Sequence, residues 1–181
     1  MLPNQNTIEN WDALWTKTGY KFPEMKAVNE RKHKVASLIP KAVTVIDVAA
    51  GAGQIRNFLH PSVTYIALDF SLVSLKMNGK LRIHADINAL PLKQKSAHTV
   101  IAMEILEHLD NPVTFLNRIA AIANRQIIIT VPDNRLPPDQ NGWHRATYTA
   151  ESLTILLARG IKHSRITTYK TKLNLVARCI L

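Results

Sequence analysis

The sequence predicts a three-layer α/β fold, a mostly parallel sheet of seven strands with helices on both faces. Three observations lead to this prediction. Short β-branched runs alternate with segments whose apolar residues recur at helical spacing. Each of the first three runs ends at an acidic residue. The last two runs are separated by only a few residues, so they must pair as an antiparallel hairpin, which adds one antiparallel strand to the sheet.

The segment before the first predicted strand carries aromatic side chains but no strand pattern. Trp11 and Trp15 lie in its first half, and Pro23 is expected to begin a helix that Pro40 ends. We interpret residues 1–40 as a lid or helical region packed across the mouth of the sheet. The alternative is that these aromatic side chains only extend the core. Residues 41–181 then form the core of a single domain, 1–181.

The centre of the prediction is the run from Val43 to Leu59. Its first six residues, which include Asp47, have the composition of a buried strand. A turn of small residues follows, in which Gly51 and Gly53 lack a Cβ, so the backbone can turn sharply and a ligand can approach it. Apolar residues then recur at helical spacing. We expect that helix to point its free amide groups and positive dipole end at a bound ligand.

Two further acidic residues follow predicted strands. Asp69 comes directly after the run 63–68 and 22 residues after Asp47, the spacing at which an acid holds ribose hydroxyls. Asp86 lies near the end of the run 81–87. Carboxylates at one edge of a sheet are costly unless they accept hydrogen bonds. The three acids therefore indicate a binding site at the carboxyl ends of the strands.

The later elements follow from the same signals. Pro112, preceded by Asp110 and Asn111, is a strong helix start. Thr149 is expected to cap the last helix and Gly160 to end it. A loop at 132–145 is long enough to indicate a function or disorder. The remaining predicted strands are 98–103, 126–131, 161–168 and 172–180.

Composition limits the class of protein. The net charge of +10, from 23 basic and 13 acidic residues, fits either a nucleic-acid partner or a solvated basic surface. The polar start carries no apolar signal region, and no apolar run approaches the roughly 20 residues that cross a bilayer. With Cys179 as the single cysteine, we expect a cytoplasmic protein without a disulfide or a membrane span. The sequence leaves open whether it is a monomer or a homodimer.

From Trp11 to its C-terminus, the chain resembles the class I S-adenosylmethionine-dependent methyltransferases. The resemblance rests on Asp47-Val-Ala49-Ala-Gly51-Ala-Gly53, in which Ala49 replaces the first glycine of the family motif. It also rests on the pattern that begins at Thr149 and continues through Glu151 to the end of the last helix. The resemblance implies a Rossmann-like methyltransferase fold and S-adenosylmethionine as the cofactor.

The resemblance also assigns cofactor contacts. It implies that the glycine turn lies beside the methionine part, that Asp69 binds the ribose hydroxyls, and that Asp86 accepts from the adenine amino group. Arg31, on the N-terminal helix, could pair with the cofactor carboxylate, or it could be a solvated surface arginine. The full set of implied cofactor residues is Arg31, Asp47, Ala49, Gly51, Gly53, Asp69, Phe70, Asp86, Ile87 and Met103.

A Glu-x-x-Glu-His cluster follows the fourth predicted strand. Glu104, Glu107 and His108, with His144 from the long loop, could together ligate Mg²⁺ or Mn²⁺. The cluster resembles that of ubiquinone-biosynthesis O-methyltransferases and of small-RNA 2′-O-methyltransferases. The alternative is a metal-free site, in which one carboxylate contacts the cofactor or a main-chain amide.

Acceptor and catalytic residues are predicted around the same rim. Trp143, with Trp15, could stack on a flat acceptor, or Trp143 could only anchor the loop. The catalytic candidates are Glu104, His108 and His144, of which His144 could instead cap the following helix. Three functions follow as hypotheses: methyl transfer to a small molecule, with oxygen as the acceptor atom; 2′-O-type methylation of RNA; and non-catalytic binding of S-adenosylmethionine.

Overall fold

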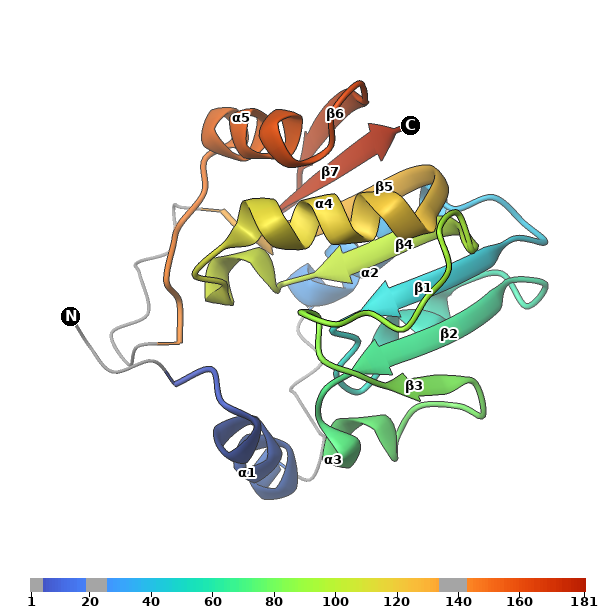
Figure 1. The fold of residues 1–181 in the computed structure, drawn as a ribbon, viewed down its shortest axis with the longest axis vertical. Coiled ribbons are helices and arrows are strands. Elements are labelled where there is room, and N and C mark those ends of the chain that lie inside the picture. The colour runs from blue at the N-terminus through green and yellow to red at the C-terminus, as the bar shows by residue number, and fades with distance from the viewer. Residues whose placement is uncertain (1–4, 19–25, 134–142) are drawn as a thin grey trace.

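The computed structural model describes residues 5–18, 26–133 and 143–181, and in this part of the chain a seven-stranded sheet has the order β3-β2-β1-β4-β5-β7-β6 (Figure 1). Strands β1 to β5 are parallel, and β7 is antiparallel to both β5 and β6. The predicted fold class is therefore confirmed. The strands are β1 (Thr44–Val48), β2 (Thr64–Asp69), β3 (Arg82–His84), β4 (Ala97–Met103), β5 (Ala123–Pro132), β6 (Arg165–Lys170) and β7 (Asn174–Ile180).

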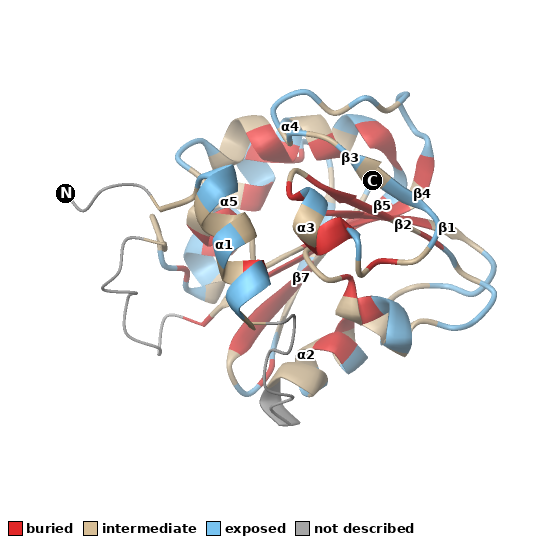
Figure 2. Ribbon diagram, turned by 90° about the horizontal axis from the view of Figure 1, so that it is seen from below, coloured by how far each residue is buried: buried red, intermediate tan, exposed pale blue. Residues whose placement is uncertain are grey.

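Helices cover both faces of the sheet, and Figure 1 shows α4 in front of it and α2 behind it. One face packs against α2 (Lys26–Ser37), the 3-10 helix η1 (Gln54–Phe58) and α3 (Leu72–Leu75); the other packs against α4 (Pro112–Ile122) and α5 (Ala150–Gly160). Neighbouring strand residues point to opposite faces: Val45 packs with Val35 of α2, and Ile46 belongs to the cluster that contains Phe115 of α4. The buried strands run through the middle of the molecule (Figure 2).

Two further helical elements lie at the carboxyl ends of the parallel strands. They are α1 (Ile8–Thr18) and the 3-10 helix η2 (Leu106–His108). The order of the sheet reverses between β1 and β4, and ligands of open α/β sheets bind at such a switch point. The fold therefore places its site where β1, β2 and β4 end.

Local sequence signals explain where α4 and α5 begin. Asn111 caps α4 by accepting from the backbone N–H of Thr114 at 3.2 Å, and Pro112 occupies the first turn. Thr149 caps α5 in a reciprocal arrangement with Ser152. Pro23, which was predicted to begin the second helix, lies outside the described residues.

Two expectations need correction. The helix expected after the glycine turn is only η1, a 3-10 helix of five residues. Such a short helix carries little macrodipole, so the dipole argument for ligand binding does not hold. The third strand was expected over 81–87 and is three residues long. It lies at the edge of the sheet and pairs only with β2, and Arg82 and His84 are exposed, so little packing extends it.

Candidate active site

The small-residue turn after β1 adopts left-handed backbone conformations. Ala49, Gly51 and Gly53 have φ values of 59°, 53° and 62°. The Gly51 N–H donates to Oδ2 of Asp69 at 2.8 Å, which ties the turn to the end of β2. A Cβ atom added to Gly51 would lie 2.8 Å from the Trp15 ring, which is too close. Glycine at 51 is thus required both by the turn and by the close packing of α1.

Asp69 is buried and well bonded. Its Oδ1 accepts from the Ser71 N–H at 2.8 Å, and its Oδ2 accepts from Gly51. Burial raises the pKa of Asp69, while the backbone N–H donors act in the opposite direction. A carboxylate has about four acceptor positions, so two backbone donors leave others for ligand hydroxyls.

The other two acids of the strand ends differ from Asp69. Asp86 is exposed, and its Oδ1 accepts from the Asn88 N–H at 2.7 Å. Asp47 is fully buried, and its Oδ2 accepts from the Tyr65 hydroxyl at 2.7 Å. Burial raises the pKa of Asp47 to about 7.

One cavity of about 980 Å³ opens at this edge of the sheet. Its volume is at the upper end of the range of about 300–1,000 Å³ for small-molecule sites, so it has room for a cofactor and an acceptor. Asp47 does not line it, and its carboxyl group is instead buried against the Tyr65 hydroxyl. The cavity does bring together nine of the ten residues predicted to contact the cofactor: Arg31, Ala49, Gly51, Gly53, Asp69, Phe70, Asp86, Ile87 and Met103.

Glu104 lies in the wall of this cavity and is held by three donors. Its carboxylate pairs with Arg31 at 2.7 Å and accepts from Thr130 and Asn174 at 2.8 Å each. Its backbone is left-handed, with a φ of 54°. Both Arg31 and Glu104 line the cavity, and in this structure they are paired with each other.

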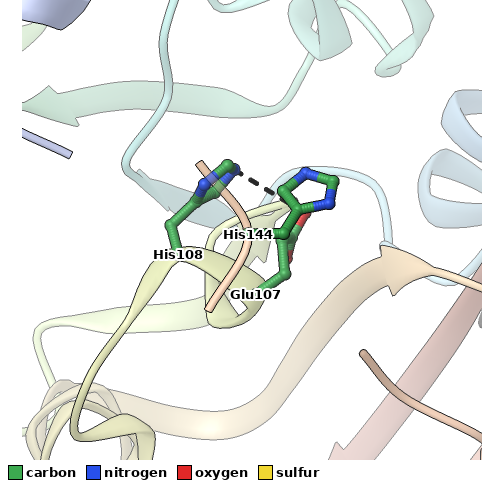
Figure 3. Close-up of side chains that lie close together, drawn as sticks. All are labelled: Glu107, His108 and His144. Atoms are coloured by element: carbon green, nitrogen blue, oxygen red, sulfur yellow. Dashed lines mark ion pairs between the residues drawn. The ribbon is translucent and has the colours of Figure 1, made fainter. Parts of the chain in front are cut away.

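Three other residues of the predicted metal set converge without Glu104. One ligand atom each from Glu107, His108 and His144 lies within 4.8 Å of the other two (Figure 3). The His108 and His144 rings are 5.0 Å apart, and Nε2 of His108 is 3.9 Å from Oε1 of Glu107. The predicted four-residue set therefore splits, because Arg31, Thr130 and Asn174 occupy the Glu104 carboxylate.

Glu107 is the unusual member of this cluster. It is 1% exposed, and neither carboxylate oxygen has a hydrogen-bond partner. Burial, and then the charge of Glu104, raise the pKa of Glu107 well above its ordinary value. Its backbone C=O accepts from the N–H groups of Arg145 and Ala146, which fixes the segment carrying His144 beside it.

Trp11 lines the cavity, although it was not among the site residues predicted from the sequence. Trp15 lines it as well, and the Trp11 ring packs edge-on against Trp143 at 4.7 Å and His108 at 5.3 Å. Trp143 is not a lining residue: it packs behind Trp11, and its C=O lies 2.8 Å from Nδ1 of His108. The i, i+4 spacing of Trp11 and Trp15 on one helix was the signal that could have found it.

Comparison with known proteins agrees with this geometry. Residues 46–126, from β1 into β5, match the sequence model of a family described as a methyltransferase domain. The match identifies this region as a methyltransferase domain, and the seven-stranded sheet has the fold of S-adenosylmethionine-dependent methyltransferases. By sequence, no curated protein matches it. Among the described residues, no helix has both the length and the apolar character to cross a bilayer.

Solved structures show the same fold at low identity. A methyltransferase from Aquifex aeolicus is 15% identical, with a TM-score of 0.71, over 93% of this chain and 97% of that one. The 1,6-didemethyltoxoflavin-N1-methyltransferase of Burkholderia thailandensis, solved with 1,6-didemethyltoxoflavin and S-adenosylhomocysteine, is 15% identical with a TM-score of 0.78. That match covers 96% of this methyltransferase and 86% of the Burkholderia chain.

Proposed function

We propose that this methyltransferase transfers a methyl group from S-adenosylmethionine to an oxygen of a small cyclic acceptor. The observation that carries the proposal is that one cavity is lined by nine of the ten predicted cofactor residues together with Trp11 and His108. An indole face beside an imidazole suits a flat ring with a polar substituent. The Burkholderia neighbour acts on a flat compound, although at nitrogen.

In the proposed complex, Asp69 accepts from the ribose hydroxyls and Asp86 from the adenine amino group, with Ile87, Phe70 and Met103 packing beside them. These acceptors suit the donors of an adenosyl group. Arg31 is proposed to turn from Glu104 to the cofactor carboxylate. The pairing at 2.7 Å then keeps its guanidinium at the cavity wall until the cofactor arrives.

The proposed chemistry is an in-line displacement. An acceptor oxygen forms a bond to the methyl carbon as the carbon–sulfur bond breaks, and the sulfonium leaves as the thioether S-adenosylhomocysteine. A hydroxyl must lose its proton for this step, and His108 is proposed to accept it, with His144 beside it. The approach requires the reacting atoms to be held about 3 Å apart, which is the role proposed for Trp11 and Trp15.

The donor set of Glu107, His108 and His144 fits a divalent cation. A buried carboxylate without a hydrogen-bond partner beside two imidazoles matches the preference of Mn²⁺ or Mg²⁺ for carboxylate and of transition metals for imidazole. Such an ion would use His108 as a ligand, so it would replace His108 as the activating group by lowering the pKa of the acceptor hydroxyl itself. Chelation followed by Mn²⁺ or Mg²⁺ should abolish and restore activity; indifference to both would remove the metal from the proposal.

The first test is direct binding of S-adenosylmethionine and S-adenosylhomocysteine, measured by calorimetry. We expect micromolar affinity, and a folded sample that binds neither would overturn the proposal. Methyl transfer is then measured with labelled cofactor on phenols and on matched anilines. Transfer to anilines alone would show that the acceptor atom is nitrogen and not oxygen. No transfer to any acceptor, with the cofactor bound, would favour a non-catalytic cofactor-binding protein.

A 2′-O-methyltransferase of RNA is the second candidate, favoured by the net charge of +10. It predicts RNA binding that weakens steeply between low and high salt. RNA affinity that does not change with salt, or no methyl transfer to RNA, would leave the small-molecule assignment.

We also propose a cytoplasmic location. The protein is proposed to be a monomer or a homodimer, and gel filtration distinguishes the two.

A further inference from the structure

The glycine turn is held from the side opposite Asp69 by Asn78. The Asn78 Nδ2 donates to the C=O of Gly51 at 2.7 Å and approaches the C=O of Ser74 at 3.4 Å. The N–H of Gly51 donates to Asp69. Both backbone polar groups of Gly51 are therefore fixed by side chains, one by the proposed ribose acid and one by Asn78.

Gly53 makes room for the same side chain. A Cβ on Gly53 would lie 1.6 Å from Oδ1 of Asn78 and 2.7 Å from its Cγ. No side chain fits there while Asn78 keeps its position. From the sequence, the missing Cβ of Gly53 was expected to let a ligand approach; in the structure, the Asn78 amide occupies that space.

Asp69 and Asn78 belong to one short segment. Ser71 donates its N–H to Asp69 and its side chain caps α3, and Asn78 follows α3 and returns to Gly51. Asn78 is 8% exposed, so water does not readily replace its amide. The segment thus begins at the acid and closes on the turn that the acid also binds.

We propose that Asn78 is a positioning residue for the cofactor. By holding the Gly51 C=O, it fixes the peptide that follows Gly51 and keeps the Gly51 N–H directed at Asp69. The left-handed backbone at Gly51 and Gly53 then presents the same surface to each incoming cofactor molecule. This inference rests on the proposed cofactor contacts of Asp69 and the glycine turn.

The first experiment measures S-adenosylhomocysteine binding by calorimetry for the wild type, Asn78→Ala and Asn78→Asp. We expect Asn78→Ala to weaken binding about tenfold, the effect of one lost buried hydrogen bond. Asn78→Asp should weaken it more, because a carboxylate would face the Gly51 C=O. An Asn78→Ala variant with wild-type affinity would overturn the inference.

Gln126→Ala is the matched control. Gln126 is also a buried amide, 2% exposed, and it donates to the backbone C=O of Leu38 at 3.0 Å, away from the cavity. Gln126→Ala also removes its hydrogen bonds with Thr99 and Arg178, so we expect it to lower the melting temperature at least as much as Asn78→Ala does. Affinity should stay within about twofold, because these bonds lie away from the cavity. An equal loss of affinity in the control would reduce the role of Asn78 to general stability.

A double-mutant cycle with Gly53→Ala separates positioning from backbone strain. Gly53 has a left-handed φ of 62°, which strains an alanine whether residue 78 is Asn or Ala. The methyl group of that alanine would clash with the side chain of Asn78, and the clash is absent in the Asn78→Ala background. Gly53→Ala should therefore weaken binding about tenfold more in the wild type than in Asn78→Ala. Equal effects would overturn the inference, and Asn78→Ser replaces Asn78→Ala if the latter does not fold. Absent binding by the wild type would instead overturn the proposed function.

Discussion

Asp69 and Glu107 are two buried carboxyl groups at the same edge of the sheet, and their surroundings are opposite. Each oxygen of Asp69 accepts from a backbone N–H, at 2.8 Å in both cases. Neither oxygen of Glu107 has a hydrogen-bond partner. A buried carboxyl group without hydrogen bonds is destabilising, and one that accepts hydrogen bonds is less so. Asp69 is therefore held in place before any ligand binds, whereas Glu107 has no hydrogen bonds that would hold its carboxyl group in one position.

The largest effect is expected from Asp69→Ala. It removes the acceptor for Gly51 and Ser71 together with the proposed ribose contact, so affinity for S-adenosylhomocysteine should fall at least about 100-fold. Calorimetry measures this change. Asp110→Ala is the control, because Asp110 lines the same cavity but is exposed and bonded to Arg145. Wild-type affinity in Asp69→Ala would show that the hydrogen bonds of Asp69 do not contribute to cofactor binding.

Asp47 lies between these two cases, because one oxygen accepts from Tyr65 and the other has no partner. Its pKa of about 7 in the folded protein exceeds the value of about 3.9 in the unfolded chain. The folded state therefore binds more protons between about pH 4 and pH 7, and stability should fall as pH rises through that window. The slope from this group is at most about 1.4 kcal/mol per pH unit.

Asp47→Asn should remove that slope, since an amide keeps an acceptor for Tyr65 and carries no charge. Chemical denaturation of both proteins from pH 4 to pH 8 provides the test, with the difference between the two free energies of unfolding as the readout. Parallel curves for the wild type and the variant would contradict a raised pKa at Asp47.

Glu107→Leu should stabilise the apo protein. It replaces a carboxyl group that lacks hydrogen bonds with apolar bulk of similar size, so the free energy of unfolding should rise by about 1–3 kcal/mol. Calorimetric binding of Mn²⁺ should be lost in the same variant, while affinity for S-adenosylhomocysteine stays within about twofold of wild type. A less stable Glu107→Leu protein would show that Glu107 has partners equivalent to those of Asp69.

The smallest effect is expected from Ala49→Gly, which restores the glycine of the family motif. Ala49 has a φ of 59°, a conformation that costs an alanine about 1 kcal/mol relative to glycine. We expect a stabilisation of about that size by chemical denaturation, with cofactor affinity unchanged. Ala50→Gly is the control, because Ala50 has no positive φ and should lose stability.

Local sequence was sufficient for most of the fold. β-branched runs located β1, β2, β4 and β5, since buried parallel strands require them, and Pro112 and Thr149 marked the starts of α4 and α5. The positions of Asp69 and Asp86 after their strands followed from the same periodicity. The edge strand β3 and the short η1 were not predictable in length, because packing against neighbours sets where weak elements end.

What the sequence determined by itself is the class of fold, the family and the acids that end its parallel strands, because periodicity and turn chemistry are properties of neighbouring residues. Only the tertiary structure decided that Glu104 binds Arg31, that Trp11 forms the wall assigned to Trp143, and that Asn78 fills the space beside Gly53. The reason is distance along the chain. Gly53 and Asn78 are 25 residues apart, Arg31 and Glu104 are 73, and Trp11 and Trp143 are 132. No local sequence pattern specifies contacts between residues so far apart.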